Sequence, residues 1–440
     1  MQSGRHRVRQ AKESAVFETH FRRQAWQRAM LPMVLAVALL LPTSVAAQES
    51  GDPETFRTWL ASLRNEARGQ GIGASTLDSA LTGLAPIPRV IELDRRQPEF
   101  TQTFWGYMEG RINDQRIARG RELLKQHGPL LKRIEREYGV QDRFLVAFWA
   151  LESNFGDFTG GFPVIGALAT LAYDPRRSDF FRAELLTALK IIDSRHITAQ
   201  RMTGSWAGAM GQCQFMPTTF ARYGRDGDGD GRIDLWDSLP DIFASAANFL
   251  AKSGWNGSET WGREVRLPAS FDLDQSGLEV RRSIAEWQRL GVRRMDGGDL
   301  PQADIQASLV LPAGYRGPAF MVYGNFRATL VWNRSINYAI SVGHLADRLA
   351  WQPPLTAKRP PDDAPMSREH VIEMQERLAR AGFYAGSPDG IAGAGTREAL
   401  RAFQRHRGLP TDGHPSPQML EVLRQATNAA LSQREKLARM

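Results

Sequence analysis

The chain contains the apolar run Phe144-Leu-Val-Ala-Phe-Trp-Ala-Leu-Glu-Ser-Asn-Phe-Gly156, in which Glu152 is the only charge between Arg143 and Asp157. This run predicts a buried helix that Gly156 can end. A carboxyl group in apolar surroundings has a raised pKa and can reach a reaction still protonated. Glu152 is therefore a candidate general acid. The alternative is a glutamate that ends a core helix and reaches solvent.

From Pro53 to Asn154 the apolar residues mostly recur at helical spacing, which predicts a mainly α protein. Examples are Phe56, Leu60, Leu63 and Ala67, then Leu123, Leu130, Ile134 and Tyr138. Between Gly262 and Phe320 the pattern changes to the short strand-like runs Val265-Arg-Leu267 and Ser308-Leu-Val-Leu311, with proline and glycine around them. These runs predict a small β-rich subdomain, after which Ser335–Leu349 returns to helix.

Domain boundaries follow from composition. The proline-rich segment 352–365 predicts an extended linker between a large domain at 52–351 and a small domain at 366–428. The small domain is expected to be a compact unit of short helices, and residues 429–440 are expected to form a frayed tail.

The first 47 residues are typical of a secretory signal peptide. Arg22, Arg23 and Arg28 come shortly before the apolar run Leu31–Pro42, which small residues follow up to Ala47. The apolar run is short of the roughly 20 residues that a membrane anchor needs, so an anchor is the weaker alternative. No cysteine stands at the expected cleavage point after Ala47, so a lipid anchor is not supported. The basic segment before the apolar run is long, so the true start codon is an open question.

Charge and cysteine content exclude other classes. The formal charge is +8, but seven Lys/Arg against two Glu in residues 1–47 supply +5 of it, which leaves about +3 for the rest. No basic stripe with interleaved aromatics follows, so we expect no nucleic-acid partner. Cys213 is the only cysteine, which excludes an intrachain disulfide.

A second unusual segment is Gly204-Ser-Trp-Ala-Gly-Ala-Met-Gly-Gln-Cys-Gln-Phe-Met-Pro217. Its glycines let a backbone approach a ligand closely, and Ser205 and Gln214 can hydrogen-bond a sugar or orient a carboxyl group. Cys213 with His196 as base is a conceivable nucleophile, but a small buried cysteine is far commoner.

An acidic glycine-rich segment, Asp226-Gly-Asp-Gly-Asp-Gly-Arg-Ile-Asp-Leu-Trp-Asp237, follows the EF-hand loop template. The template assigns a calcium site to the side chains of Asp226, Asp228, Asp230 and Asp237 and to the backbone carbonyl of Arg232. Asp241 is an alternative to Asp237 as the last ligand. One unpaired loop predicts a structural calcium site rather than a sensor, and the alternative is an acidic surface turn.

Three motifs together resemble the lytic murein transglycosylase B family. They are Ala147-Phe-Trp-Ala-Leu-Glu-Ser-Asn-Phe-Gly156, the segment 204–217, and Asn333-Arg-Ser-Ile-Asn-Tyr-Ala339. The resemblance runs from about Phe56 to Trp351 and includes the acidic loop. Residues 371–413, with Asp389-Gly and Asp412-Gly turns, resemble a peptidoglycan-binding domain with three helices.

The resemblance implies a lysozyme-like helical core that acts on peptidoglycan glycan strands in a Gram-negative periplasm, either soluble or associated with the cell wall. By similarity, Glu152 is the single catalytic acid/base, and Ser205, Gln214, Asn333 and Tyr338 position the glutamate and the sugar. The implied reaction cleaves the β-1,4 bond between N-acetylmuramic acid and N-acetylglucosamine and forms 1,6-anhydromuramic acid ends. No organic cofactor and no membrane span in the mature chain are expected.

The residues alone leave two other functions possible. One is a hydrolytic muramidase, in which water attacks the sugar. The other is a non-catalytic peptidoglycan-binding protein that keeps the fold.

Overall fold

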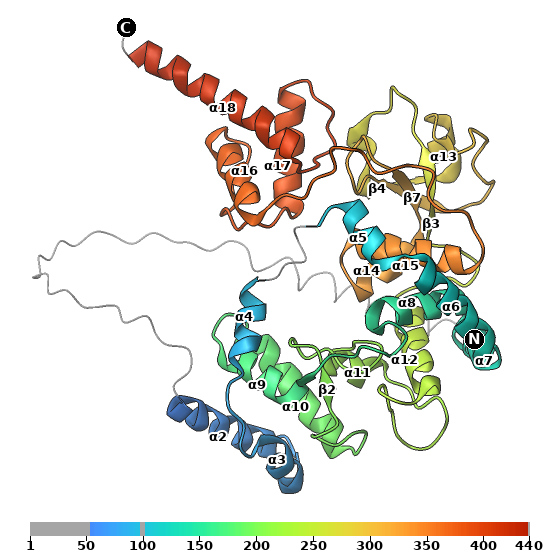
Figure 1. Ribbon diagram of the computed structural model, residues 1–440, viewed down its shortest axis with the longest axis vertical. Helices are drawn as coiled ribbons and strands as arrows, with labels where there is room; N and C mark the ends of the chain where they lie inside the picture. The colour runs from blue at the N-terminus through green and yellow to red at the C-terminus, as the bar shows by residue number, and fades with distance from the viewer. Residues whose placement is uncertain (1–52, 97–101, 439–440) are drawn as a thin grey trace, which may run out of the picture. The chain divides into compact units, whose positions relative to one another are not determined.

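The computed structural model describes residues 53–96 and 102–438 (Figure 1). The expected signal peptide lies outside these residues. No helix among the described residues is both long enough and apolar enough to cross a membrane.

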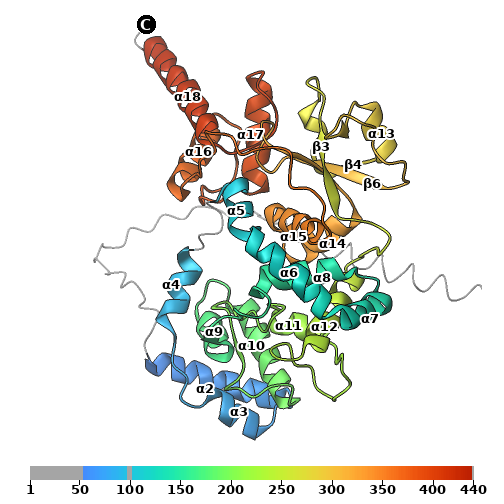
Figure 2. The same ribbon diagram turned by 45° about the vertical axis from the view of Figure 1, so that its right-hand side comes forward.

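Helix α8 (Asp142–Ser153) is the centre of the helical part, because all its side chains from Phe144 to Leu151 are apolar. Leu145, Val146 and Ala147 are at most 1% exposed. Helices α6, α7, α12 and α15 all contact α8, and Figures 1 and 2 show α6 and α15 beside it. Burial of this apolar surface, at about 25 cal/mol per Å², is the main stabilising contribution of the core.

The helices of the large domain run through most of its length. They are α2 (Pro53–Gly69), α3 (Ala74–Leu81), α4 (Pro88–Arg96), α5 (Phe104–Arg111), α6 (Asp114–Gln126), α7 (Gly128–Tyr138), α8, α9 (Val164–Tyr173), α10 (Ser178–Asp193), α11 (Pro217–Tyr223), α12 (Leu239–Lys252), α13 (Ile284–Arg289), α14 (Gly324–Trp332) and α15 (Ile336–Leu349). A short antiparallel pair, β1 (Phe162–Pro163) and β2 (Thr203–Gly204), joins the two segments that flank α9 and α10.

The expected β-rich subdomain is present. Its antiparallel sheet has the strand order β4-β6-β7-β3-β5. The strands are β3 (Gly262–Arg266), β4 (Gly277–Ser283), β5 (Arg293–Arg294), β6 (Gln306–Val310) and β7 (Ala319–Val322). Trp287 of α13 is fully buried on this sheet, and its indole N–H donates to the carbonyl of Ala307 at 3.0 Å. The subdomain therefore has its own hydrophobic core.

The C-terminal domain consists of α16 (Arg368–Arg380), α17 (Ala394–His406) and α18 (Pro417–Ala438) around a small apolar core. Gln375 and Gln404 are buried and hydrogen-bond the turns that contain Asp389 and Asp412. Helix α18 continues to Ala438. Residues 429–438 are therefore helical, contrary to the expected frayed tail.

The linker contains no helix or strand between Ala350 and Ser367, and it is attached to the large domain. The carboxylate of Glu264 accepts hydrogen bonds from the backbone N–H groups of Thr356 and Ala357, at 2.7 and 2.8 Å. Thr103 donates to Asp363 at 2.7 Å. These bonds make the linker a fixed connection rather than a free spacer.

Candidate active site

Glu152 lies in the last turn of α8, where the helix ends in a left-handed turn. Asn154, Phe155 and Gly156 have φ angles of 52°, 62° and 86°. The Asn154 and Phe155 N–H groups donate to the carbonyls of Ala150 and Trp149, at 3.1 and 3.2 Å. These bonds satisfy carbonyls at the helix end and hold the chain beside Glu152 in place.

The carboxyl group of Glu152 accepts two hydrogen bonds on one oxygen. The indole Nε1 of Trp332 donates to Oε1 at 2.8 Å, and the hydroxyl of Tyr338 donates to the same atom. Burial raises the pKa of Glu152 to about 7, although these two bonds lower it. Glu152 therefore keeps its proton below pH 7, and part of the molecules keep it at neutral pH.

Aromatic rings hold the indole of Trp332 in position. Its ring centroid lies 4.6 Å from that of Phe148, 4.9 Å from Phe249 and 5.1 Å from Phe215. This packing holds the indole N–H of Trp332, from α14, against the carboxyl group of Glu152, from α8. Trp332 was absent from the predicted site residues, although it directly precedes Asn333 in the third motif.

The site contains one carboxyl group, that of Glu152. Among the described residues, no second carboxylate contributes to the pKa shift of Glu152. Glycosidases of the two-carboxylate type place a second acid about 5 to 9.5 Å away to attack or to activate water. The geometry at Glu152 instead fits a single group that first donates a proton and then accepts one.

The loop at 204–217 supports the loop that follows α8. Gln214, at φ 50°, donates from Nε2 to the carbonyls of Thr159 and Gly211, both at 2.9 Å. Ser205 Oγ accepts from the N–H groups of Ala207 and Ala209 at 3.3 and 3.0 Å. Both predicted residues therefore brace loops, and neither has a recorded hydrogen bond to Glu152 within the described chain.

Gln212 is a further bracing residue that the sequence interpretation did not include. Its Oε1 accepts from Trp149 Nε1 and its Nε2 donates to the Trp236 carbonyl, both at 2.6 Å. A Cβ atom on Gly156 would lie 2.4 Å from Gln212 Oε1. Glycine is required at 156 because of this contact and because of its positive φ.

The third motif contributes from the start of α15. Tyr338 is buried and contacts Glu152 directly, whereas Asn333 is exposed at the end of α14. Asn333 Oδ1 accepts from the Ser335 N–H at 3.0 Å, and its amide N–H₂ group forms no hydrogen bond within the described residues.

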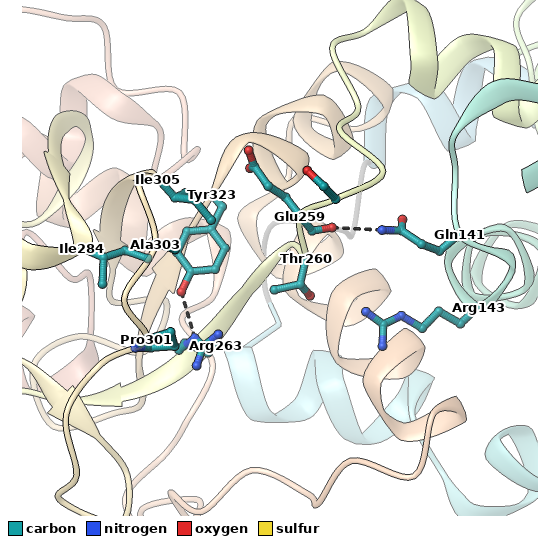
Figure 3. A pocket seen from close by; sticks show the side chains of 11 residues that line it. Gln141, Arg143, Glu259, Thr260, Arg263, Ile284, Pro301, Ala303, Ile305 and Tyr323 are labelled. Atoms are coloured by element: carbon teal, nitrogen blue, oxygen red, sulfur yellow. Dashed lines mark hydrogen bonds between the residues drawn. The ribbon is translucent and has the colours of Figure 1, made fainter. Parts of the chain in front are cut away.

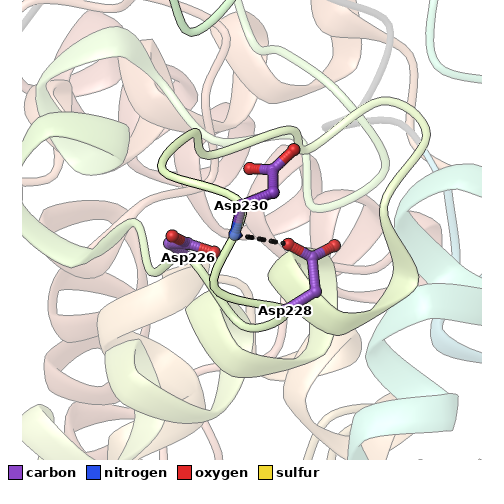
Figure 4. Close-up of side chains that lie close together, drawn as sticks. All are labelled: Asp226, Asp228 and Asp230. Carbon is purple, nitrogen blue, oxygen red and sulfur yellow. Dashed lines mark hydrogen bonds between the residues drawn. The ribbon is translucent and has the colours of Figure 1, made fainter.

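The acidic loop brings three of its predicted ligands together (Figure 4). Carboxylate oxygens of Asp226, Asp228 and Asp230 all lie within 4.8 Å of one another. Asp226 also accepts from the N–H groups of Gly229 and Gly231, at 2.6 and 2.8 Å. Three clustered, exposed carboxylates suit a hard cation such as Ca²⁺.

Asp237, the predicted ligand at the twelfth position of the loop, does not lie in this cluster. Asp237 forms an ion pair with Arg201. Asp241 is buried, and its two oxygens accept from the N–H groups of Gly227 and Asp234, both at 2.7 Å. Asp241 therefore braces the loop. The side chain of Arg232 pairs with Asp230 at 3.1 Å.

Cys213 and His196 do not form a nucleophile and base pair. The buried thiol of Cys213 donates to the Ile242 carbonyl at 3.3 Å, and burial raises its pKa. His196 Nδ1 accepts from the Ile233 N–H at 3.0 Å. Cys213 is thus a core residue.

Residues 55–347 match the model of the transglycosylase SLT domain, and residues 367–423 match that of a putative peptidoglycan binding domain. The fold and the single carboxyl group at Glu152 agree with this class. The chain therefore belongs to the transglycosylase SLT domain family of lytic transglycosylases, and within it is similar to lytic murein transglycosylase B. The expected lysozyme-like helical core, with its β-rich subdomain and C-terminal helical domain, is confirmed.

Three relatives illustrate the similarity. SltB3 of Pseudomonas aeruginosa, solved in complex with NAG-anhNAM-pentapeptide, is 47% identical with a TM-score of 0.82, over 84% of this chain and 99% of that one. Membrane-bound lytic murein transglycosylase B of Escherichia coli (strain K12) is 30% identical over 259 residues. These are 56% of this chain and 66% of the length of that curated relative. Escherichia coli Slt35, solved in complex with calcium, is 26% identical with a TM-score of 0.58, over 71% of this chain and 99% of that one.

Proposed function

We propose that this protein is a peptidoglycan lytic transglycosylase. It cleaves the β-1,4 bond between N-acetylmuramic acid and N-acetylglucosamine and leaves a 1,6-anhydromuramic acid end. The observation that carries this proposal is the carboxyl group of Glu152, held on one oxygen by donors from α14 and α15. The similarity to SltB3, solved with an anhydro-muramyl ligand, supports the same reaction.

In the first step, the neutral Glu152 donates its proton to the glycosidic oxygen as the bond to C1 of the muramic acid breaks. Both hydrogen-bond donors contact Oε1. The transferred proton is therefore the one on Oε2, which has no recorded hydrogen bond within the described residues. The leaving sugar departs as a neutral alcohol, and positive charge develops at C1.

In the second step, the Glu152 carboxylate removes the proton of the C6 hydroxyl of the same muramic acid. The C6 oxygen attacks C1 and closes the 1,6-anhydro ring. Glu152 is protonated again, and no water is consumed. The bonds from Trp332 and Tyr338 stabilise the carboxylate between the steps, because hydrogen bonds to a charged form favour that form.

For substrate binding, we assign Asn333 and Tyr338 to direct contact with the glycan, and Ser205 and Gln214 to holding the loops after α8 and at 204–217 in place. The exposed amide of Asn333 and the position of Tyr338 beside Glu152 support the first assignment. The loop-bracing hydrogen bonds of Gln214 and Ser205 support the second.

We further propose a structural Ca²⁺ site at Asp226, Asp228 and Asp230, with the carbonyl of Arg232. The clustered carboxylates support it, as does the relative solved with calcium. Asp237 completes the site if its carboxylate leaves the ion pair with Arg201 and binds the metal. The ion would hold the loop between α11 and α12 and has no part in the reaction.

The C-terminal domain is proposed to bind peptidoglycan, and the protein to act in the periplasm, exported by the signal peptide. The match of residues 367–423 to a peptidoglycan-binding domain supports the first assignment, and the composition of residues 1–47 supports the second.

Isotope labelling separates this reaction from hydrolysis. Sacculi are digested with the mature protein in H₂¹⁸O, and the products are analysed by mass spectrometry. A transglycosylase gives anhydro products without ¹⁸O at C1. A muramidase gives reducing ends that carry ¹⁸O. A folded protein that binds sacculi without cleaving them supports the binding-protein function instead.

A further inference from the structure

The two ends of helix α8 have different surroundings. Its N-terminal end borders a cavity of about 330 Å³ beside the β-rich subdomain (Figure 3). Burial raises the pKa of Asp347, and the charges of Arg143 and Arg263, which line the cavity, counter this rise. These charges are therefore used within the fold. The C-terminal end of α8, which carries Glu152, is instead held by the side chain of Gln212.

The amide group of Gln212 connects α8 to the acidic loop at 226–237. Its Oε1 accepts from the indole Nε1 of Trp149, and its Nε2 donates to the carbonyl of Trp236, both at 2.6 Å. An indole N–H can only donate and a carbonyl can only accept, so turning the amide over would break both bonds. The orientation of Gln212 is therefore fixed by its two partners.

The backbone beside Gln212 contacts the same end of the acidic loop. The N–H of Gln212 donates to the carbonyl of Leu235 at 2.7 Å. Gly211 has a φ angle of 62°, and a Cβ atom there would lie 2.5 Å from that carbonyl oxygen. The indole Nε1 of Trp236 donates to the carbonyl of Thr203 at 2.9 Å. The end of the loop is thus packed closely against the segment that contains Gln212.

Asp241 joins this end of the acidic loop to the end that carries the proposed metal ligands. Its two oxygens accept from the N–H groups of Gly227 and Asp234, both at 2.7 Å. Asp234 Oδ1 in turn accepts from the N–H groups of Trp236 and Asp237, at 2.8 and 2.9 Å. A cation held by the clustered carboxylates therefore acts on a loop whose two ends are hydrogen-bonded to each other.

On the side of the active site, Trp149 lies about one turn before Glu152 on α8. The carbonyl of Trp149 accepts from the N–H of Phe155 and from Oγ of Ser153, both at 3.2 Å. The chain directly after Glu152 is thus bonded to the residue that Gln212 holds.

Glu152 also lies close to the segment that contains Gln212. Burial raises the pKa of the Cys213 thiol, and the negative charge of Glu152 adds to this rise. Tyr338, from α15, is a second titratable group in contact with Glu152. Because burial is also what raises the pKa of Glu152, a looser turn that admits water would lower that pKa.

We propose that Gln212 is a positioning residue that couples the acidic loop to the catalytic acid, so that calcium in the loop stabilises the turn that carries Glu152. This inference rests on the proposed function, because it needs both the calcium site and the role of Glu152. The ion has no part in the reaction itself and acts through Gln212 and Trp149. Without calcium, the turn is held less firmly.

The first test follows the Trp149 indole by NMR in the full mature chain, labelled with ¹⁵N at its tryptophans. Added calcium chloride should shift the signal of this N–H, which is identified by its absence in Trp149→Phe. The signal of Trp287, whose indole N–H donates to the carbonyl of Ala307, should not shift. Gln212→Met keeps the length of the side chain but removes both of its hydrogen bonds. In this variant calcium should still raise the melting temperature, and the Trp149 signal should stay in place.

The reaction rate gives a second readout. Calcium should raise kcat of the wild type about fivefold, within the usual range of coupling between two sites, with little change in KM. It should also move the alkaline limb of the pH–rate profile to higher pH, because a tighter turn keeps water from Glu152. Gln212→Met and Trp149→Phe should both lose these responses to calcium, whereas Trp287→Phe should keep them.

Melting temperatures check that the variants fold, and Trp149→Phe, which leaves Gln212 bonded to the loop, also carries the rate test on its own. Calcium binding without a shift of the Trp149 signal, or with an equal shift in Gln212→Met, would overturn the coupling and leave the metal site standing. A protein that binds no calcium would contradict both. A shifted Trp149 signal in a protein that forms no anhydro product would contradict only the proposed reaction.

Discussion

Trp332 Nε1 lies 2.8 Å from Glu152 Oε1, although 180 residues separate the two in the chain. This contact joins α14, which follows the β-rich subdomain, to the end of the central helix. The acid is therefore positioned by parts of the chain that lie far apart in the sequence and meet in the fold of the large domain.

Trp332→Phe should lower kcat about tenfold and move the alkaline limb of the pH–rate profile to higher pH. The substitution keeps the ring packing but removes a hydrogen bond that lowers the pKa of Glu152. Trp287→Phe is the matched control, because it removes a buried indole N–H donor in the β-rich subdomain. A profile that does not move in Trp332→Phe would contradict the assigned role.

The stability of the protein should depend on the charge of Glu152. Its pKa is about 7 in the folded chain against an ordinary 4.5. Between these values the folded state keeps a proton that the unfolded chain has lost, so the free energy of unfolding falls as pH rises. The slope is about 1.4 kcal/mol per pH unit, and it vanishes above pH 7.

Glu152→Gln removes this dependence. Relative to the wild type, its free energy of unfolding should increase by about 2 to 3 kcal/mol between pH 5 and pH 8, as measured by urea denaturation. Glu279→Gln makes the same change at an exposed position and serves as the control. If the difference in the free energy of unfolding between Glu152→Gln and the wild type does not change with pH, the raised pKa of Glu152 is contradicted.

Gly156→Ala should destabilise the protein by at least about 1 to 2 kcal/mol, because φ is 86° and the added Cβ meets Gln212. Activity should fall as well, since Gln212 also holds Trp149 beside Glu152. In Gly161→Ala, the new Cβ has no atom within 4 Å, and little change is expected. Equal melting temperatures for the two variants would show that the turn after α8 tolerates a side chain.

Calcium should raise the melting temperature by several degrees, and EDTA should reverse the effect, because a ligand that binds only the folded state stabilises it. Asp228→Asn should abolish the response, whereas Asp304→Asn, outside the loop, should keep it. Asp237→Asn tests whether Asp237 joins the site. An identical melting curve with calcium and with EDTA would exclude the proposed metal.

The sequence was sufficient to predict the elements that depend on local patterns. The apolar run 144–156 predicted a buried helix with one unusual acid, and both α8 and Glu152 agree with it. Trp332 and Gln212 could not be found in this way. Their roles depend on partners 180 and 63 residues away, which only the packing of α14 and of the loop at 204–217 on α8 brings together.

The acidic loop shows a different limit of sequence patterns. The EF-hand template counts twelve positions to its last ligand, but here α12 begins at Leu239 and Asp237 pairs with Arg201. The template predicted the three clustered carboxylates correctly, since their spacing of two residues is local. It could not predict which side chain the nearby arginine would pair with.

The most direct test of the central claim is mass spectrometry of sacculi digested with the mature protein and, in parallel, with Glu152→Gln. A single-acid mechanism predicts 1,6-anhydromuropeptides from the wild type and none above background from the variant, with both proteins folded and bound to sacculi. Anhydromuropeptides at similar rates from both proteins would show that Glu152 is not the acid, and the account of this site would be wrong.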